Sequence, residues 1–282
     1  MIDDPLHQVL RASLQEFPLK PSGLAPVLRP LEGIQAVVFD FYDTLILTET
    51  STVPAGMETD VLLGSDLARR VRLAGGKLPA RASDFEAAWS ACIAATHRHR
   101  RESEPDLVQP EVHTLDVVRD FCQASLSDNL ASEVAARREA WTTRSRRAPG
   151  ARAMLGKLRA RGLTLGIGSN AQRVSESLFS LHFGGKPEAL GLTLNVWSWR
   201  LGVAKPDPAF FRHLAKLAAG LGITPARLLF VGNDPSRDIA PAANAGFATC
   251  LYAGDQRCLR PSGSRTPDAV ITCFSQLDGI LR

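Results

Sequence analysis

Residues 35–45 read QAVVFDFYDTL, and this stretch decides the fold. Its first half is a short apolar run rich in β-branched residues, bounded by Gly33 and by polar residues. Such a run is typical of a strand that is buried on both faces of a parallel sheet. Similar runs recur at Leu163–Ile167, Leu192–Trp197, Leu228–Val231, Ala248–Tyr252 and Ala269–Thr272. The sequence therefore predicts a sheet of several buried parallel strands.

Helical patterns separate several of these runs, at Ala151–Arg161, Pro208–Leu221 and Ile239–Ala245. Alternating strands and helices predict βαβ units, and therefore an α/β fold with helices on both faces of the sheet. A glycine follows each helical stretch where a left-handed cap is expected. These glycines are Gly162, Gly222 and Gly246.

A block of about 100 residues between the first and second predicted strands has a different pattern. We expect four helices there and no strand, at Asp60–Leu73, Ser83–Arg101, Glu111–Leu126 and Asp128–Arg147. Ser83 and Asp128 are the expected N-caps. Because a structureless loop of this length is improbable, the block predicts an inserted helical cap over residues 49–148. The core is then expected at 34–48 and 149–282.

The first 33 residues contain five prolines and little periodicity. They predict a partly extended arm with one short helix near Leu6–Phe17. The opening segment MIDDPLHQVL carries two acids and a proline, unlike a signal peptide, which begins with a basic segment followed by an apolar one. Neither secretion nor membrane insertion is expected, because no apolar run approaches the ~18–20 residues of a membrane span.

Composition narrows the possible partners. The chain of 282 residues is 45% hydrophobic, which is enough for a sizeable core, and its net charge of only +4 predicts no nucleic-acid partner. Five cysteines without CxxC spacing indicate neither a disulfide framework nor a zinc site, so a reducing cytoplasm is the expected location. Cys250 and Cys273 are expected in the core. The oligomeric state is left open.

Polar residues follow four of the predicted strands, where ligands of such sheets bind. The first strand ends at Asp40, and the second is followed by Ser169-Asn170. The third and fourth are followed by the segments GVAKPDP (202–208) and GNDPSRD (232–238). If these ends converge, they join a carboxylate, a hydroxyl, an ammonium and a second carboxylate pair. Phosphoryl transfer through an aspartyl intermediate with Mg²⁺ requires these groups.

These four segments, in this order, resemble the motifs of the haloacid dehalogenase-like hydrolase superfamily. The position of the predicted cap, between the first and second motifs, resembles that of the helical-cap subfamily. The resemblance covers residues 34–282 and implies a Rossmann-like core with an inserted α-helical cap. It implies a hydrolase that acts on a small anionic molecule. The arm at 1–33 lies outside the resemblance.

The resemblance assigns a role to each matching residue. Asp40 is implied as nucleophile and metal ligand, with Thr44 and Ser169 hydrogen-bonding the transferring group and Lys205 neutralising charge. Asp234 is implied as a direct Mg²⁺ ligand, and Asp238 as a helper through water or as an orienter of Lys205. The backbone carbonyl of Tyr42 is the remaining implied ligand. The substrate is expected to contact Tyr42 and Asn170. Oxygen ligands of this kind suit Mg²⁺.

Two positions depart from the pattern of the family's phosphatases. Tyr42 stands where they usually place a second aspartate as general acid, and a phenol with a pKa near 10 is a weak acid for that task. Asp43 cannot replace it, because neighbouring side chains point in different directions, and it resembles a structural acid of the family. Asn233 stands where many relatives carry an acid, although Asp234 directly follows it.

Tyr42 also supports an alternative. The family's L-2-haloacid dehalogenases carry tyrosine at this position and use no metal, because their aspartate attacks carbon and expels halide. Against this, Asp234 would repel a substrate carboxylate unless a cation covered it. The leading hypothesis is an Mg²⁺-dependent hydrolase of a small phosphorylated or phosphonate metabolite. A dehalogenase and a weakly active or non-catalytic binding protein are the alternatives.

The basic run His97-Arg98-His99-Arg100-Arg101 could suggest an anion or metal site. The sequence favours a solvated helix end, because cations are stabilised near the C-terminus of a helix.

Overall fold

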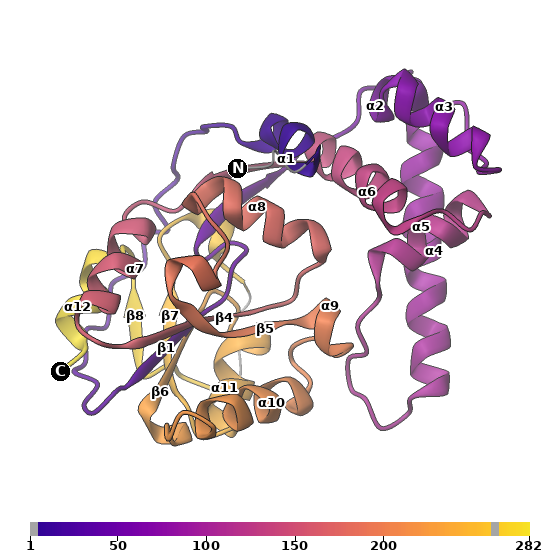
Figure 1. The fold of residues 1–282 in the computed structure, drawn as a ribbon. Coiled ribbons are helices and arrows are strands. Elements are labelled where there is room, and N and C mark those ends of the chain that lie inside the picture. The colour runs from indigo at the N-terminus through magenta and orange to yellow at the C-terminus, as the bar shows by residue number, and fades with distance from the viewer. Residues whose placement is uncertain (1–4, 261–264) are drawn as a thin grey trace.

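The computed structural model describes residues 5–260 and 265–282. A six-stranded parallel sheet forms the centre of the molecule (Figure 1), with the strand order β5-β4-β1-β6-β7-β8. The strands are β1 (Ala36–Phe39), β4 (Thr164–Ser169), β5 (Leu192–Trp197), β6 (Leu228–Gly232), β7 (Ala248–Tyr252) and β8 (Ala269–Ile271). All six predicted strands are confirmed, with ends that differ by at most two residues.

Strand β1 lies between β4 and β6 and is buried on both faces. Val37 and Phe39 pack into one apolar cluster, with α7 (Ala151–Ala160), α8 (Arg173–Phe183) and α12 (Ser275–Ile280). Ala36 and Val38 pack into the other, with α10 (Pro208–Ala219) and α11 (Ala240–Asn244). The alternation is that of a strand, because successive side chains point to opposite faces. It confirms helices on both faces of the sheet.

Shorter elements complete the core. They are the α-helix α9 (Ser198–Leu201), a π-helical turn at Pro235–Ile239, and 3-10 turns at Glu188–Leu190, Pro225–Arg227 and Gln256–Cys258. The helix predicted at Ile239–Ala245 therefore begins earlier, as the π-helical turn, and ends at Asn244. The glycines expected at helix ends, Gly162, Gly222 and Gly246, all adopt positive φ.

Close strand packing depends on a glycine in β4. A Cβ on Gly166 would lie 2.0 Å from the carbonyl oxygen of Leu194 in β5, far inside van der Waals contact. The strand therefore requires glycine at this position.

The predicted helical cap is present and has its own apolar cluster. Its helices are α2 (Thr59–Leu63), α3 (Ser65–Leu73), α4 (Ala82–Ser103), α5 (Thr114–Cys122) and α6 (Asp128–Thr142). The helix predicted at Asp60–Leu73 is divided in two at Gly64, whose φ of 84° is not helical. Ser127, not Asp128, caps α6, and Ser83 lies inside the first turn of α4, after Arg81.

The prediction of a helix to Arg147 is wrong. Helix α6 ends at Thr142, and Thr143–Arg147 forms β3, which pairs antiparallel with β2 (Ile46–Thr50). Ser145 is the buried residue of this strand, whereas Arg144 is exposed and Arg146 packs over the ring of Phe17 in the N-terminal arm. A run rich in arginine also suits a helix, and only the partner strand β2, almost 100 residues earlier, makes a strand of it. The β2–β3 ribbon joins cap to core.

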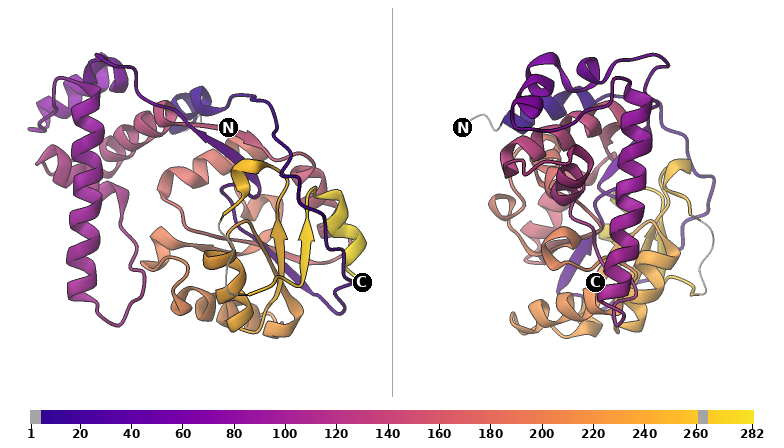
Figure 2. Two further views of the ribbon diagram at one scale, coloured as in Figure 1. Left: turned by 180° about the vertical axis from the view of Figure 1, so that it is seen from behind. Right: turned by 90° about the vertical axis from the view of Figure 1, so that its right-hand side faces the viewer.

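The N-terminal arm contacts both cap and core. Its helix α1 (Pro5–Leu10) and the 3-10 turn Arg11–Ser13 confirm the short helix that was expected, and the first four residues lie outside the described part of the chain. Leu10 is fully buried in the cap's apolar cluster. Farther on, Val27 pairs with Val270 of the edge strand β8, and Leu31 N donates to Ile280 O. The left view of Figure 2 shows the arm running alongside the edge of the sheet at β8, which it covers.

Two further predictions concern the cysteines and the membrane. Cys250 is buried in the core as expected, but Cys273 is half-buried at the end of the sheet, because the chain turns there into α12.

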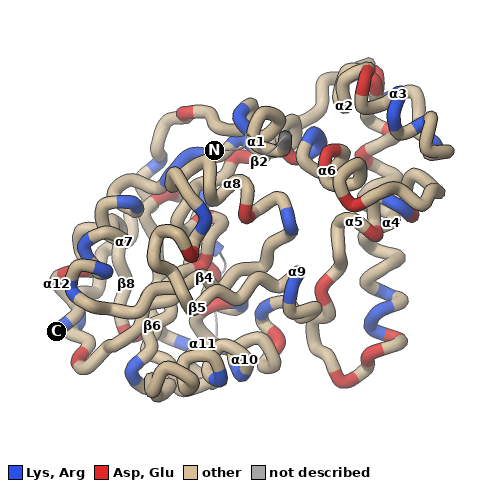
Figure 3. Tube along the Cα trace, in the orientation of Figure 1, with Lys and Arg blue, Asp and Glu red and all other residues tan. Residues whose placement is uncertain are grey.

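Among the described residues, no helix combines the length and the apolar character that crossing a membrane would require. Acidic and basic residues are interspersed over both core and cap (Figure 3).

The burial of Leu10 makes the arm part of the folded unit. Replacing it with alanine (L10A) should lower the free energy of unfolding by about 2–5 kcal/mol, the usual cost of removing a buried leucine side chain. L19A is the matched control, because Leu19 of the same arm is 41% exposed. Urea unfolding of both variants measures the difference, and equal stability of L10A and wild type would contradict the role of the arm.

His182 of α8 predicts a pH dependence of stability. Its Nε2 lies 2.9 Å from Ser145 Oγ, and burial, with the positive charge of Arg147, lowers the pKa of His182 to about 4. In the unfolded chain this pKa is near 6.5, so the unfolded state binds the proton first as the pH falls. The fold should lose up to about 3 kcal/mol between pH 6.5 and pH 4 through this residue.

Glutamine at this position (H182Q) should remove that part of the acid destabilisation, because its side chain does not titrate. Urea unfolding at pH 7 and pH 4 measures the loss in each protein, with H99Q as the control, since His99 is exposed. Equal losses in wild type and H182Q would show that His182 does not titrate as described.

Candidate active site

The ammonium of Lys205 lies between two carboxylates that come from different strand ends. Lys205 Nζ is 2.9 Å from Asp40 Oδ1 and 2.6 Å from Asp238 Oδ1. It also donates to the carbonyl oxygen of Gly168 in β4, at 2.9 Å. An ammonium has three N–H donors, so all three are used within the protein. The side chains expected to converge from three of the four strand ends therefore touch.

Asp238 is held on both of its oxygens. Oδ1 accepts from Lys205, and Oδ2 accepts from the backbone N–H of Asp234 at 2.9 Å. With both oxygens engaged and the side chain 1% exposed, Asp238 is built to orient Lys205. Of the two roles that the resemblance implied for Asp238, this geometry favours orientation over metal binding.

Asp234 opens the helical segment that follows β6. Its Oδ1 accepts from the backbone N–H groups of Ser236 and Arg237, at 2.8 and 3.0 Å. The side chain thus has a second function as an N-cap, which is frequent for aspartate. Asn233 beside it donates to the carbonyl oxygen of Cys258 at 2.8 Å and thereby ties two loops together.

Asn170 binds the backbone of Lys205 on both sides. Its Nδ2 donates to Lys205 O at 2.9 Å, and its Oδ1 accepts from Lys205 N at 2.7 Å. These two hydrogen bonds fix the loop that carries the Lys205 side chain. The implied substrate-binding residue is therefore, first of all, a positioning residue, although it also lines the pocket.

Thr44 and Ser169 are both fully buried. Thr44 Oγ1 has no hydrogen-bond partner, and Ser169 Oγ makes only a long contact of 3.4 Å with Asn170 O. Neither residue is among those that line the pocket at Asp40. A buried hydroxyl without a partner is costly, so Thr44 has hydrogen-bonding capacity left for a bound group.

The pocket at Asp40 holds more negative than positive side chains. Its volume is about 120 Å³, and it is lined by Asp40, Tyr42, Asp43, Asn170, Lys205, Asn233, Asp234, Arg237, Asp238 and Arg260. Burial by itself would lower the pKa of Lys205, but Asp238 and Asp40 outweigh it and raise the pKa, so the ammonium stays charged. Burial raises the pKa of Asp238, against the effect of Lys205. Four carboxylates thus face three cationic side chains.

The structural role expected for Asp43 is confirmed by the hydrogen bonds of its carboxylate. It adopts φ of 57°, a conformation that aspartate tolerates better than most residues. Its Oδ1 accepts from the backbone N–H and the hydroxyl of Thr48, and its Oδ2 accepts from Arg260 at 2.5 Å. The carboxyl therefore braces the turn after β1 and leaves Arg260 paired.

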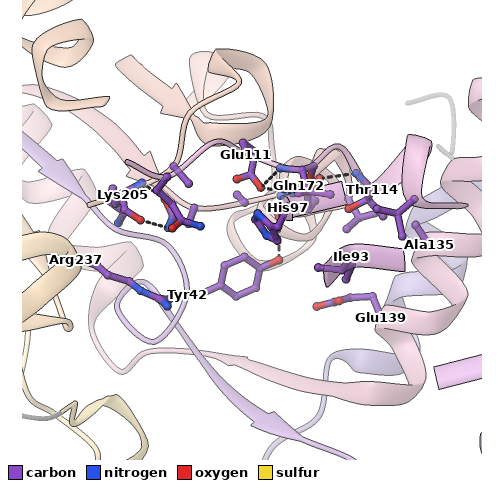
Figure 4. Close-up of a pocket in the computed structure, with 18 of the residues that line it drawn as sticks. Tyr42, Ile93, His97, Glu111, Thr114, Ala135, Glu139, Gln172, Lys205 and Arg237 are labelled. Carbon is purple, nitrogen blue, oxygen red and sulfur yellow. Dashed lines mark hydrogen bonds between the residues drawn. The ribbon is translucent and has the colours of Figure 1, made fainter. Parts of the chain in front are cut away.

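Tyr42 separates the small pocket from a larger cavity of about 600 Å³ between core and cap (Figure 4). Its hydroxyl lies 2.8 Å from Ser175 Oγ. Burial, with the negative charges of Glu139 and Asp40, raises the pKa of Tyr42 well above its usual value. The phenol keeps its proton at any working pH and is a poor donor of it. The two spaces adjoin, because they share four lining residues: Tyr42, Asn170, Lys205 and Arg237.

A parallel sheet, an inserted helical cap and a lysine shared between Asp40 and Asp238 together call for comparison with known families. A family model described as haloacid dehalogenase-like hydrolase matches residues 34–246. The chain belongs to this family. It is a hydrolase by that membership. A search of curated proteins finds no match.

Solved structures show the same fold in proteins of two activities. A 2-haloacid dehalogenase from Pseudomonas syringae pv. Tomato is 23% identical, with a TM-score of 0.55, and covers 88% of this chain and 97% of its own. A phosphatase of the family from Thermococcus onnurineus is 16% identical, with a TM-score of 0.50, and covers 88% of this chain and 97% of its own. At these identities the likeness establishes the fold and leaves the reaction open.

The structure adds functional candidates that sequence reasoning missed. Arg237 lies within the fourth motif and could have been noticed there, because it stands one residue before Asp238. Arg260 is far from any motif. The solvated helix end expected for the basic run is confirmed for Arg98, His99 and Arg101, which are exposed. His97 instead lines the cavity. Glu139 on α6 also lines the cavity, and no pattern in the sequence marked it.

The donor groups of the small pocket suit a hard divalent cation. Among residues 5–260 and 265–282, no three His, Cys, Asp or Glu side chains form a ready-made metal site. Asp40 and Asp234 nevertheless offer carboxylate oxygens in a pocket with surplus negative charge. Mg²⁺ is usually bound through one or two carboxylates together with water and substrate phosphate oxygens. The residues therefore fit Mg²⁺ bound by Asp40 and Asp234, with Asp238 outside the ligand set.

Proposed function

We propose that this hydrolase cleaves a small phosphorylated or phosphonate metabolite with the help of Mg²⁺. The single observation that carries the proposal is the charge balance around Asp40. Lys205 is already divided between two carboxylates, and Asp234 adds a further negative charge to the same pocket. A phosphate dianion that arrives with a divalent cation adds no net negative charge to this surplus, whereas a lone organic anion increases it.

Asp40 is the nucleophile of the proposed reaction. Its Oδ1 is hydrogen-bonded to Lys205, which leaves Oδ2 to attack phosphorus. The bond from phosphorus to the leaving oxygen, or to the leaving carbon of a phosphonate, breaks, and the leaving group takes a proton from water. A water molecule then attacks the phosphorus of the aspartyl phosphate, releases phosphate and restores the carboxylate. Mg²⁺, bound by Asp40, Asp234 and the carbonyl of Tyr42, would supply positive charge to the phosphoryl oxygens.

The neighbouring residues hold the transferring group. Lys205 and the hydroxyls of Thr44 and Ser169 would donate to the phosphoryl oxygens, and the unpartnered Thr44 Oγ1 supports this role. Asp238 and Asn170 keep Lys205 in place. The cap lies over the cavity, where it would exclude water and contact the rest of the substrate.

Tyr42 supports a second candidate, a metal-independent 2-haloacid dehalogenase. Expulsion of halide needs no proton, which suits a phenol of raised pKa. Arg237 lines the pocket and forms no ion pair within the described residues, so it is the cation that could cover a substrate carboxylate. Asp234 opposes this reading, because it places a carboxylate in the same space.

Replacing the nucleophile tests the reaction. In the presence of Mg²⁺ the wild type should release phosphate from p-nitrophenyl phosphate, and D40N should lose at least about 10³-fold in kcat, because an amide cannot attack phosphorus. EDTA should abolish the wild-type activity. Chloride release from 2-chloropropionate that persists in EDTA would instead establish the dehalogenase, and ligand binding without any turnover would establish a binding protein.

The leaving group should decide the rate, since Tyr42 is a poor proton donor. Aryl and acyl phosphates, whose leaving groups need no proton, should be hydrolysed at least about 10²-fold faster than simple alkyl phosphates, which is the usual contribution of a general acid. Steady-state kcat values for p-nitrophenyl, acetyl and propyl phosphate measure this. Equal rates would reveal an effective general acid elsewhere in the site.

A further inference from the structure

The larger cavity is polarised along its length. Its positive side chains next to the small pocket, Lys205 and Arg237, line both spaces. Glu111 and Glu139 line only the larger cavity. In Figure 4, Lys205 and Arg237 lie at one end and Glu139 at the other, beyond Tyr42. A substrate whose phosphate is at Asp40 would therefore extend its organic part toward carboxylates. We call this part of the cavity, around His97, Glu111 and Glu139, the distal chamber.

The distal chamber is rich in hydrogen-bond acceptors. Glu111 is 8% exposed, and its Oε1 accepts from Val112 N at 2.8 Å and from Gln172 Nε2 at 3.1 Å. Burial lowers the pKa of His97, so the imidazole is neutral, and its buried Nδ1 has no hydrogen-bond partner. A neutral ring nitrogen without a partner has capacity left for a ligand group.

Arg138 and the side-chain amide of Gln172 are already engaged. Among the described residues that line the cavity, Arg138 is the only Lys or Arg besides Lys205 and Arg237. It donates to Glu86 at 2.7 Å and lies 4.9 Å above the ring of Trp89. Gln172 Nε2 is divided between Glu111 and the carbonyl oxygen of Val112. A second carboxylate or phosphate on the substrate would meet like charge here without a free cation.

Glu139 is placed to face the organic part of the substrate. It lines the cavity on the cap side, from helix α6, and its charge acts on Tyr42 across the cavity. Burial raises the pKa of its carboxyl, against the effects of Arg138 and of a hydrogen bond from Thr143. Burial penalises the bare carboxylate, and a cation beside it would relieve that penalty.

We propose that the distal chamber binds a protonated amine, so that the substrate is a phosphate monoester of an amino alcohol. This rests on the proposed phosphohydrolase function and narrows it. An ammonium carries three N–H donors and one positive charge, which matches acceptors from Glu111, Glu139 and His97. Apolar walls from Trp89, Ile93 and Val117 would contact the carbon chain between the two charged ends.

Kinetic comparison of three esters tests the amine. O-Phosphoethanolamine carries the ammonium, propyl phosphate is its neutral counterpart, and phosphoglycolate carries a carboxylate instead. With Mg²⁺ present, kcat/KM should be at least tenfold higher for O-phosphoethanolamine than for propyl phosphate, and lowest for phosphoglycolate. Equal values for the first two, or a preference for phosphoglycolate, would overturn the inference.

Variants of the distal chamber locate the effect. E139Q and E111Q should each bring the ratio of kcat/KM between O-phosphoethanolamine and propyl phosphate toward one, mainly by raising KM for the amine. E102Q is the matched control, because Glu102 is an exposed carboxylate on α4 and should keep the ratio. Circular dichroism and the Tm of each variant report folding. An unchanged ratio in folded E139Q and E111Q would exclude these carboxylates from substrate selection.

Hydrolysis of p-nitrophenyl phosphate, which has no amine, separates this inference from the function on which it rests. If the enzyme hydrolyses that ester but shows no preference for the amine, only the inference fails. If it hydrolyses no phosphate ester at all, the proposed function fails and the inference fails with it.

Discussion

The buried ammonium of Lys205 is the interaction on which the site depends. It is 3% exposed and draws its three partners from β4, from the turn after β1 and from the segment after β6. A charge of this kind is stable inside a protein only while its partners stay in place, and removing one partner of a buried pair typically costs about 3–5 kcal/mol. The strand ends are thus held together by the same charge that the proposed reaction would use. Replacing Lys205 would therefore disturb both the packing of these strand ends and the proposed reaction.

Space around that charge is divided in two. The small pocket has room for little more than a phosphoryl-sized group and its counterion, whereas the cavity under the cap is several times larger. Tyr42 stands where the two meet, and its contact with Ser175 ties it to α8. In the proposed function, the small pocket holds the phosphoryl group and the cavity under the cap holds the remainder of the substrate. The carboxylates of Glu111 and Glu139 in the distal chamber make that part of the larger cavity negatively charged.

The cap is tied to the core at more than one point. The β2–β3 ribbon carries the chain into and out of it. The N-terminal arm, which precedes the residues 34–246 that match the family model, adds a further connection. Helix α1 packs on α6 of the cap and on α8 of the core, and Gln15 N then donates to Ser145 O of β3. A segment attached on both sides of a joint restricts movement at that joint. The arm therefore connects cap and core independently of the β2–β3 ribbon.

The sequence by itself determined the sheet, the inserted cap and the identity of the residues around Asp40. Buried parallel strands leave continuous apolar runs, and each functional residue follows such a run, so local pattern was sufficient for Asp40, Lys205 and Asp238. It was insufficient for β3, whose partner lies almost 100 residues away, and for Gly64, which divides one predicted helix into two.

Only the tertiary structure decided what each polar group does. It gave both oxygens of Asp238 to hydrogen bonds, turned Asn170 toward the backbone of Lys205, and placed His97 and Glu139 in a cavity that no pattern announced. The physical reason is that a side chain's role depends on its burial and its partners, and both are set by contacts between segments distant in the chain. Residue types and their spacing indicate which reactions the side chains could support, and tertiary packing decides which role each side chain takes.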